Sequence, residues 1–392
     1  MPFVELFAGI AILAVIYHHV GYPALLAVIA RGRRLTPPER SAGAEAPMIS
    51  IVVAAYQEEA HIAAKIQNCA ALDYPRDRLE VIIACDGCRD STVAKARAAA
   101  QAWWIGADLD VKVLDFPVNR GKVAALNDAL ATARGEIVVA TDASALLSID
   151  GLRRIAAWFS DPTIGVVCGT YALLDQPSAG EAAYWRMQTG VLRREGRIAA
   201  PLGAHGAGYA FRLAAWTMLP PDTINDDFIL PSRIIAQGYR GVYDDQVVAL
   251  EMEPSNDAQS FRRRVRISAG NMQQLLRSGG LIDFRRPALA WLFLSGKGLR
   301  PVMPFVMIAA WGASLAAAYM GSGLFAVLWA GQTLGYLTGA VAPALRRRLP
   351  ARLGRLGRGL ETLQYIVWGH AAGLCGALRY LGGLERGRWT RV

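Results

Sequence analysis

GEIVVATDAS, residues 135–144, joins four consecutive apolar residues directly to a Thr-Asp pair, with Asp142 at the end and Ser144 two positions later. An apolar run of this length is typical of a strand buried on both faces, as the strands of a parallel sheet are. Ligands of such sheets bind beyond the carboxyl ends of the strands. A carboxylate at that position is held rigidly and faces the ligand, which makes Asp142 a candidate binding residue.

The sequence before this segment repeats the alternation of strands and helices. Short apolar runs at residues 50–55, 79–87 and 111–116 are separated by stretches with helical spacing, the last of which we expect to end at Gly135. The alternation predicts an α/β fold with a mostly parallel sheet covered by helices on both faces. Polar residues also follow the first two of these strands, namely Tyr56, Glu58 and Asp86.

Apolar residues are concentrated at the two ends of the chain. Hydrophobic residues make up 53% of the 392 residues, and the mean hydropathy of +0.25 is high for a wholly soluble protein. Residues 1–30 are long enough to cross a bilayer, and the arginines within residues 31–34 favour a retained anchor followed by a cytoplasmic domain. Residues 301–320 and 322–344 predict a hairpin of two further membrane helices.

These segments predict a multi-pass protein of the cell (inner) membrane. The expected regions are a membrane anchor at 1–30, a linker at 31–47, an α/β domain at 48–284, an interfacial segment at 285–300, two or three C-terminal membrane helices at 301–382 and a basic tail at 383–392. Residues 361–382 either span the membrane or lie in its interface, and the sequence leaves both open.

The net charge of +10 favours a lipid bilayer as partner and not a nucleic acid. Much of the arginine lies beside the apolar segments, where it matches anionic headgroups, and the chain carries no zinc-finger or RNA-binding signature. Cys85 and Cys88 form a single CxxC pair. One such pair is weak support for a metal site or a disulfide in a reducing cytoplasm.

No glycine-rich loop is available to hold a nucleotide. The chain has no GxxxxGK[ST] motif, and the turn after the first strand, AAYQEEA, contains no glycine. Asp142 could instead hold a divalent cation that neutralises a diphosphate, with Ser144 acting directly or through water. Hard cations such as Mg²⁺ accept one carboxylate together with waters and phosphate oxygens.

Six segments, taken in this order, resemble the membrane-bound inverting family 2 glycosyltransferases, which include cellulose, hyaluronan and chitin-oligosaccharide synthases. They are SIVVAAYQEEAHI, IIACDGCRDST, NRGKVAALNDAL, VVATDAS, GAHGAGYAFR and NDDFILPSRI. The resemblance covers roughly residues 48–300 and implies a GT-A fold, a Rossmann-like nucleotide-sugar domain, for residues 48–284. One such motif is weak support, whereas six in the order of the family are specific.

The resemblance implies a donor site and a cofactor. Donor-binding roles are implied for Tyr56, Glu58, Asp86, Lys122, Asp142, Ser144, Arg263 and Arg266. Asp142 matches the first acid of the family's DxD metal motif and would be the principal ligand of Mg²⁺ or Mn²⁺, because Ser144 replaces the second acid. Arg263 and Arg266 take the first and fourth places of the QxxRW motif, where arginine suits a diphosphate. A basic helix lying on lipid is the alternative for this segment.

The resemblance also implies catalytic and acceptor residues. INDDF matches the family's acidic pair, with Asp227 as catalytic base and Asp226 beside it. The base takes a proton from the acceptor hydroxyl, and two adjacent carboxylates raise one another's pKa. Asp226 could alternatively cap a helix. Trp185 and His205 are candidate acceptor residues. An aromatic residue is at least as often buried in the core, and a single histidine is more often structural than catalytic.

The resemblance implies transfer of a sugar, with inversion, from a nucleotide diphosphate sugar, expected to be UDP-linked, to a membrane-associated glycan or lipid-linked acceptor in polysaccharide synthesis. Two alternatives stay open. One is transfer of a single sugar to polyprenyl phosphate or a glycolipid. The other is a non-catalytic, nucleotide-binding subunit of a polysaccharide secretion complex, which the altered DxD and QxxRW motifs favour and the intact acidic pair opposes.

Overall fold

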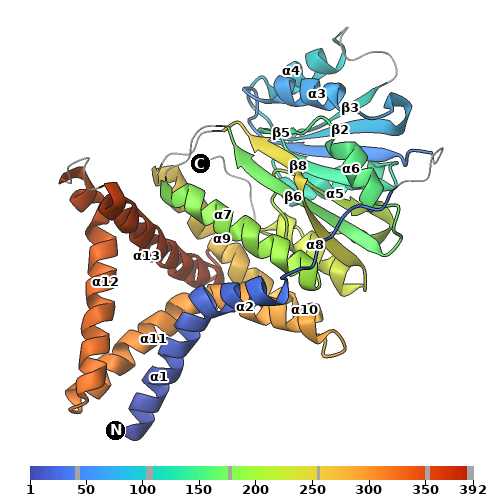
Figure 1. The fold of residues 1–392 in the computed structure, drawn as a ribbon. Coiled ribbons are helices and arrows are strands. Elements are labelled where there is room, and N and C mark those ends of the chain that lie inside the picture. The colour runs from blue at the N-terminus through green and yellow to red at the C-terminus, as the bar shows by residue number, and fades with distance from the viewer. Residues whose placement is uncertain (40–44, 103–108, 175–178, 254–256, 349–353, 386–392) are drawn as a thin grey trace.

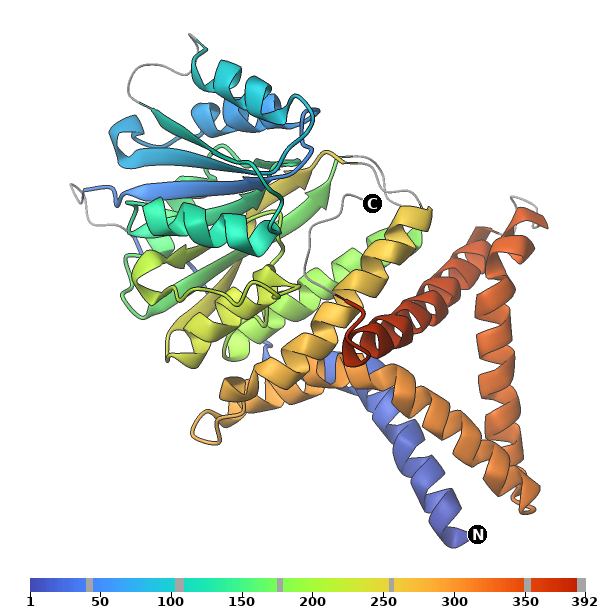
Figure 2. The same cartoon turned by 180° about the vertical axis from the view of Figure 1, so that it is seen from behind.

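The computed structural model describes residues 1–39, 45–102, 109–174, 179–253, 257–348 and 354–385. An α/β domain and a group of long helices lie side by side, and the chain begins and ends its described course among the helices (Figures 1 and 2).

One sheet forms the centre of the domain, with the strand order β3-β2-β1-β4-β7-β6-β8-β5 in the described residues. The strands are β1 (Ile49–Ala55), β2 (Leu79–Asp86), β3 (Asp110–Phe116), β4 (Ile137–Asp142), β5 (Ala145–Leu147), β6 (Ile164–Leu173), β7 (Tyr209–Arg212) and β8 (Arg240–Glu251). The first four strands are parallel, and β7 is antiparallel to both of its neighbours. The expected α/β fold with a mostly parallel sheet is confirmed.

Helices cover both faces of the sheet (Figure 1). One core contains residues of α3 (Ile62–Ala71), α4 (Thr92–Ala100) and α6 (Gly151–Trp158), and the other contains residues of α5 (Lys122–Thr132), α7 (Ala179–Ile198) and α8 (Asp226–Ala236). Successive strand residues point to opposite faces. Within β1, Ile51 and Val53 therefore belong to the first core and Val52 to the second.

The crossover pattern favours a ligand site between β1 and β4. The chain runs from β1 to β2 and β3 on one side and then returns to form β4 on the other side. Ligands of open α/β sheets bind where the strand order reverses in this way. Asp142, the last residue of β4, pairs in register with Ala54, one residue before the end of β1. Asp142 therefore lies at the reversal point.

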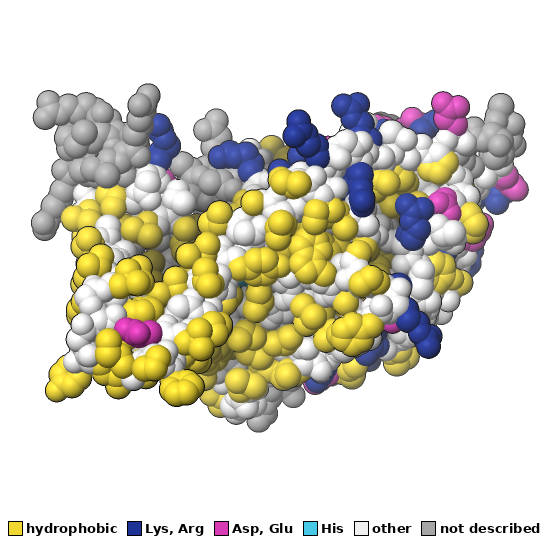
Figure 3. All heavy atoms as spheres, turned by 60° about the horizontal axis from the view of Figure 1, so that its bottom comes forward, with side chains coloured by type: hydrophobic (Ala, Val, Ile, Leu, Met, Phe, Trp, Pro, Cys, Tyr) yellow, Lys and Arg dark blue, Asp and Glu magenta, His cyan; other side chains and the backbone are white. Residues whose placement is uncertain are grey.

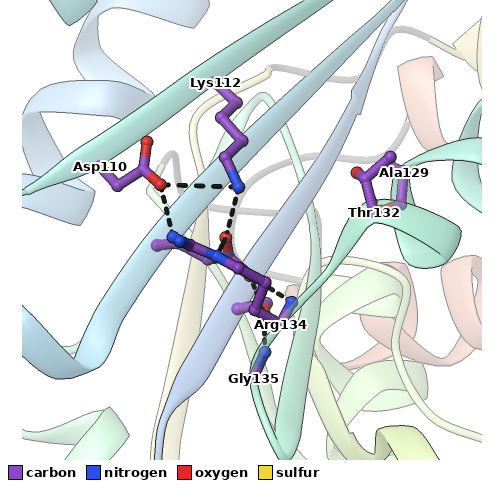
Figure 4. A network of polar contacts seen from close by, with 8 residues as sticks. Asp110, Lys112, Ala129, Thr132, Arg134 and Gly135 are labelled. Atoms are coloured by element: carbon purple, nitrogen blue, oxygen red, sulfur yellow. Dashed lines mark hydrogen bonds and ion pairs between the residues drawn. The ribbon is translucent and has the colours of Figure 1, made fainter.

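The carboxylate of Glu80 links β1, β2 and β3 near the ends at which these strands begin. Figure 4 shows the surrounding polar network, including Lys112 and Arg134. Glu80 is fully buried and accepts hydrogen bonds from the Ser50 hydroxyl at 2.6 Å, the Arg134 amide at 2.6 Å and the Lys112 ammonium at 2.9 Å. Burial favours its neutral form, but these hydrogen bonds outweigh burial and lower the pKa of Glu80 to about 2.

We expected the preceding helix to end at Gly135, and this expectation is wrong. α5 ends at Thr132 with Ala133 as its C-cap. A Cβ on Gly135 would lie 2.5 Å from the amide nitrogen of Ser50, so only glycine permits this approach. Its own amide donates to the Ser50 hydroxyl at 2.8 Å. The glycine therefore marks the entry to β4 and not a helix stop.

We expect Glu80→Gln to lower the free energy of unfolding by about 2 kcal/mol, the usual value of a hydrogen bond to a charged group. Because folding lowers its pKa, the stability that Glu80 adds is present above about pH 4 and is lost as the pH falls toward 2. Thermal unfolding of the detergent-solubilised protein at several pH values measures both effects. Asp110→Asn is the control, because the Asp110 side chain is 40% exposed. Equal stability of both variants would show that Glu80 contributes nothing.

Three helical stretches of the described chain are long and apolar enough to cross a membrane, namely Pro2–Ile29, Pro287–Tyr319 and Gly323–Leu345. They contain α1 (Pro2–Ile16), the π-helical turn η1 (Tyr17–Gly21), α2 (Tyr22–Ile29), α10 (Pro287–Leu292), the π-helical turn η6 (Phe293–Gly298), α11 (Leu299–Tyr319) and most of α12 (Gly323–Arg348). Figure 3, in which the lower side of Figure 1 is turned toward the viewer, shows hydrophobic side chains over much of this face. The region expected as an interfacial segment is continuous with α11.

The last helix, α13 (Gly354–Leu381), packs against α12 and against α9 (Asp257–Arg277) of the domain (Figures 1 and 2). It is not among the three stretches that could cross a membrane. The crossing with α9 is close, because a Cβ on Gly376 would lie 2.3 Å from the carbonyl oxygen of Val265. Most of the basic tail, residues 386–392, lies outside the described residues.

The membrane-side helices are anchored in the core of the domain. Tyr22 and Leu26 of α2 and Leu292 and Phe293 of the α10–η6 segment are buried in the second core. The Tyr22 hydroxyl donates to Glu195 Oε1 at 2.6 Å. This packing fixes the long helices to the α/β domain.

Candidate active site

Lys122 joins the two acidic motifs. It is the first residue of α5, preceded by Gly121, whose φ of +98° is accessible to glycine without strain. Its Nζ lies 3.0 Å from Asp142 Oδ1 and 3.3 Å from Asp226 Oδ2. Burial disfavours the ammonium, but the charges of Asp142 and Asp226 outweigh burial and raise the pKa of Lys122. The same ion pair lowers the pKa of Asp142 against the effect of its burial.

Asp86 holds the loop that positions Lys122. It is fully buried, and its two oxygens accept from the backbone amides of Arg120 at 3.0 Å and Gly121 at 2.7 Å. The loop then passes directly into α5, so Asp86 fixes the direction in which Lys122 leaves the backbone. A direct contact between Asp86 and a nucleoside stays a prediction.

Asp226 and Asp227 are the first two residues of α8. The alternative interpretation, in which Asp226 caps this helix, is wrong, because the N-cap is Asn225. Carboxylates in the first turn are stabilised by the positive end of the helix dipole. Burial, followed by the charge of Asp226, nevertheless raises the pKa of Asp227 to about 6. A carboxyl group with this pKa is suited to take up a proton near neutral pH.

Three charged side chains meet around Gly206. A Cβ on this glycine would lie 3.3 Å from Asp142 Oδ2, 3.6 Å from Asp227 Oδ2 and 3.7 Å from Lys122 Nζ. The missing side chain leaves room between the strand end and the helix start. The structure thus brings together Asp142 and Asp227, which are separated by 84 intervening positions in the sequence.

The residues at this point fit a divalent cation. No group of three or more His, Cys, Asp or Glu in the described residues could hold a metal alone. Mg²⁺ and Mn²⁺ commonly bind through one or two carboxylates and complete their shells with waters and substrate phosphates. Asp142 Oδ2 faces the space that the Gly206 side chain would otherwise fill. The excess of carboxylates over the single Lys122 ammonium also favours an added cation.

Among the other donor residues expected from the sequence, Ser144 and Arg263 lie near Asp142. Tyr56 and Glu58 follow β1 and are partly buried, and the Glu58 amide donates to the Thr92 hydroxyl at 2.8 Å. Ser144 is buried two positions beyond Asp142. Arg263 lies on α9, close enough to Asp142 to interact with its charge. No contact of Arg266 with the site is found among the described residues.

Trp185 and His205 belong to an aromatic cluster whose third member, Tyr171, we did not expect. The ring centroids are 4.7 Å apart for Tyr171 and Trp185, 5.7 Å for Tyr171 and His205 and 5.5 Å for Trp185 and His205. Burial and the charge of Lys297 lower the pKa of His205 to about 4. His205 is next to Gly206 in the chain, so the cluster adjoins the acidic centre.

Lys65 of α3 holds the end of β4 in place through hydrogen bonds. The sequence did not lead us to expect this role. Lys65 is fully buried in α3, and its Nζ donates to the Thr141 hydroxyl at 2.8 Å and to the Ala145 carbonyl at 2.6 Å. These bonds clamp the residues on both sides of Asp142 and Ser144. A lysine three residues after Ile62 on an apolar helix face was the available signal.

The sequence of this chain is similar to a protein-family model and to several known proteins. The model of the family described as glycosyltransferase like family 2 matches residues 46–270. Beta-monoglucosyldiacylglycerol synthase of Synechocystis sp. is 38% identical over 121 residues, 31% of this chain and 25% of that protein. Poly-beta-1,6-N-acetyl-D-glucosamine synthase of Staphylococcus aureus is 25% identical over 237 residues, 58% of this chain and 56% of that protein. The match therefore covers a quarter of the length of the Synechocystis protein and about half of the length of the Staphylococcus protein.

A solved structure extends the similarity to nearly the whole chain. The mannosyltransferase from Pyrobaculum calidifontis, in complex with GDP-Man and Mn²⁺, has a TM-score of 0.70 and 26% identity, covering 97% of this chain and 100% of that one. The match thus includes the membrane-side helices as well as the α/β domain. Because the family model matches more than half of its residues, this chain belongs to glycosyltransferase family 2.

Proposed function

We propose that the protein transfers a sugar from a nucleotide diphosphate sugar, with inversion, to a hydroxyl group of a membrane-associated glycan or lipid-linked acceptor. The observation that carries the proposal is the meeting of Asp142, Lys122 and Asp227 around Gly206. Donor-side and acceptor-side groups thereby share one site.

The proposed donor side consists of Asp142, Lys122 and Arg263. Asp142 would hold Mg²⁺ or Mn²⁺, and such a cation supplies positive charge that stabilises a departing diphosphate. The Pyrobaculum mannosyltransferase was solved with GDP-Man and Mn²⁺, which supports a divalent cation and a nucleotide diphosphate sugar here. Lys122 and Arg263 add fixed positive charge to the same place. We infer either a UDP-linked or a GDP-linked donor.

The proposed acceptor side uses Asp227 as general base. Asp227 takes the proton from the acceptor hydroxyl while the hydroxyl oxygen forms a bond to the anomeric carbon. The bond from that carbon to the diphosphate oxygen breaks, and the nucleoside diphosphate leaves. A single displacement of this kind inverts the anomeric centre, so an α-linked donor gives a β-linked product.

Family membership and the acidic pair favour an enzyme over a non-catalytic secretion subunit. Burial and the charge of Asp226 raise the pKa of Asp227, and the absence of a side chain on Gly206 leaves space next to its carboxylate. A purely structural aspartate needs neither feature. We further propose that the catalytic domain lies on the cytoplasmic side of the inner membrane, because arginines follow the first candidate span.

Release of nucleoside diphosphate from a panel of UDP- and GDP-sugars tests the proposed function. The purified full-length protein in lipid nanodiscs made from native membrane lipids supplies both enzyme and acceptor. We expect one or a few donors to be consumed with Mg²⁺ or Mn²⁺ and not with EDTA. No release from any donor, with nucleotide binding intact, would contradict catalysis.

The rate should depend on pH through Asp227. The base must be ionised, so kcat/KM should be constant above its pKa of about 6 and fall tenfold per unit below it. Asp226, Asp142, Lys122 and Lys297 all act on this carboxyl. Asp226→Asn removes the main like charge and should move the acidic limb to lower pH. A limb at unchanged pH in this variant would show that another group titrates.

A further inference from the structure

Cys85 and Cys88 lie side by side at the carboxyl end of β2. Cys85 is in the strand and fully buried, whereas Cys88 lies three positions later, is partly buried and packs against the same core. In its thiol form, Cys88 donates to the carbonyl oxygen of Ala55 at 3.5 Å, and Ala55 is the in-register neighbour of Cys85 on β1. Because neighbouring strands are about 4.8 Å apart, the two thiols adjoin one another.

The two thiols differ in reactivity. A hydrogen bond from the Cys85 thiol lowers the pKa of Cys88 to about 7, against the opposing effect of burial. The same hydrogen bond, together with burial, raises the pKa of Cys85. The thiolate is the form of cysteine that oxidants attack, so Cys88 is suited to react first and Cys85 to follow as the resolving thiol.

Oxidation suits this pair better than metal binding. In the part of the chain that the structure describes, no group of three or more His, Cys, Asp or Glu could hold a metal ion. Disulfides of a reducing cytoplasm are mostly transient and redox-sensing. We therefore expect the pair to be reduced at rest and to be oxidised only while an oxidant is present.

Gly87, between the two cysteines, packs tightly against the segment that leads to α5. Its φ is +66°, and a Cβ at this position would lie 2.3 Å from the amide nitrogen of Asn119. Its own amide donates to the carbonyl oxygen of Phe116 at 2.9 Å. The backbone between the cysteines therefore cannot turn without displacing residues 116–119.

Asp86, the other residue between the cysteines, holds the end of the same segment. Its carboxylate accepts from the backbone amides of Arg120 at 3.0 Å and Gly121 at 2.7 Å. Lys122 follows directly and forms the ion pair with Asp142. A change in the backbone at the cysteine pair thus has a short path to the proposed donor side.

We propose that Cys85 and Cys88 are a peroxide-sensitive pair, whose reversible disulfide displaces the loop before Lys122 and weakens donor binding. The sulfurs of a disulfide are about 2.05 Å apart, so Cys88 must leave the Ala55 carbonyl and turn the intervening backbone with it. The effect on the donor rests on the proposed function, whereas formation of the disulfide does not.

The oxidation proceeds in two steps and uses hydrogen peroxide as the oxidant. The Cys88 thiolate attacks one peroxide oxygen, the O–O bond breaks, and the departing hydroxide takes up a proton to become water. The sulfur of Cys85 then attacks the resulting sulfenic acid, the S–O bond breaks, and the hydroxide leaves as water with the Cys85 proton. Two thiols and one peroxide thus give one disulfide and two waters, and an added dithiol reverses the reaction.

Peptide mapping of the purified full-length protein tests the first part. Trypsin cuts after Arg78 and Arg89, so the peptide of residues 79–89 contains both cysteines and no other. After peroxide and alkylation of the remaining thiols, we expect this peptide to lose two hydrogens and to carry no alkyl group. Dithiothreitol should restore alkylation of both thiols. The change should occur at lower peroxide concentration than oxidation of Cys375, an exposed cysteine of α13.

Two measurements on the same samples test the second part. Hydrogen–deuterium exchange at the amides of Arg120 and Gly121 should become faster in the oxidised protein, because the Asp86 carboxylate no longer holds them. Affinity for UDP or GDP with Mn²⁺, whichever binds the reduced protein more tightly, should fall roughly tenfold or more, as expected for loss of one charge-assisted contact. Dithiothreitol should reverse both effects.

Cys88→Ser and Cys375→Ser are the matched variants. Serine at position 88 can still donate to the Ala55 carbonyl, so nucleotide affinity should stay within about twofold of the unchanged protein and should no longer respond to peroxide. Cys375→Ser should respond as the unchanged protein does.

Three results would overturn the proposal. The first is a peptide 79–89 that keeps both thiols when Cys375 is fully oxidised, and this result needs no variant. The second is a disulfide that forms and leaves amide exchange at residues 120–121 unchanged. The third is an equal loss of nucleotide affinity with peroxide in Cys88→Ser. A reduced protein that binds neither UDP nor GDP contradicts the proposed function instead, and peptide mapping and amide exchange then still decide on the cysteine pair.

Discussion

Asp227→Asn should lower sugar transfer by roughly 100- to 10,000-fold, the range that general-base catalysis contributes. Asparagine keeps the shape of the side chain but cannot accept the acceptor proton. Donor binding should be preserved, because Lys122 contacts Asp142 and Asp226 and not the Asp227 carboxylate. Transfer of radiolabelled sugar measures the first effect and calorimetric titration with the nucleoside diphosphate measures the second.

Asp222→Asn is the matched control for this experiment. Asp222 lies in the loop just before α8, is exposed and pairs with Arg277 at the surface. Loss of such a pair changes little, so activity within about twofold of the unchanged protein is expected. If Asp227→Asn transfers sugar as fast as Asp222→Asn does, Asp227 is not the base.

Asp142→Asn should remove the effect of the divalent cation on donor binding. The unchanged protein should bind nucleoside diphosphate more tightly with Mn²⁺ than with EDTA, and the variant should bind it equally under both conditions. The variant also loses the charge of the 3.0 Å ion pair with Lys122. We expect kcat/KM to fall roughly a hundredfold or more, as for removal of one strong electrostatic contact.

Ser144→Ala provides the comparison for Asp142. Ser144 stands where the resembling family has a second acid, and its hydroxyl is a weaker ligand than a carboxylate. The Mn²⁺ enhancement should therefore survive in Ser144→Ala. An Asp142→Asn protein that keeps the enhancement, or a Ser144→Ala protein that loses all of it, would show that the cation rests on other residues.

The α/β fold was predictable because local pattern and tertiary structure agree in it. The first four residues of the strand at 137–142 are apolar, and they are buried on both faces, as their composition indicates. Asp142 was identified from its position at the end of that strand alone. The candidate membrane helices were also predictable from the sequence, because the thickness of the bilayer sets the length and apolar composition that such helices need.

The parts that could not be predicted depend on contacts between distant segments. Gly135 ends no helix, and its role comes from the approach of Ser50, 85 positions away. A lysine usually lies at the surface, yet the Thr141 hydroxyl and the Ala145 carbonyl accept hydrogen bonds that hold Lys65 in the core. Tyr171 becomes a site residue only because β6 brings it to His205. No local pattern contains this information.

The central claim is a single displacement in one site, with the donor held by Asp142 and Lys122 and the acceptor proton taken by Asp227. The anomeric configuration of the product tests it most directly. NMR of the glycoside formed from an α-linked nucleotide sugar should show only the β-anomer. An α-linked product would contradict the account, because retention requires a chemistry in which Asp227 is not a base acting on the acceptor.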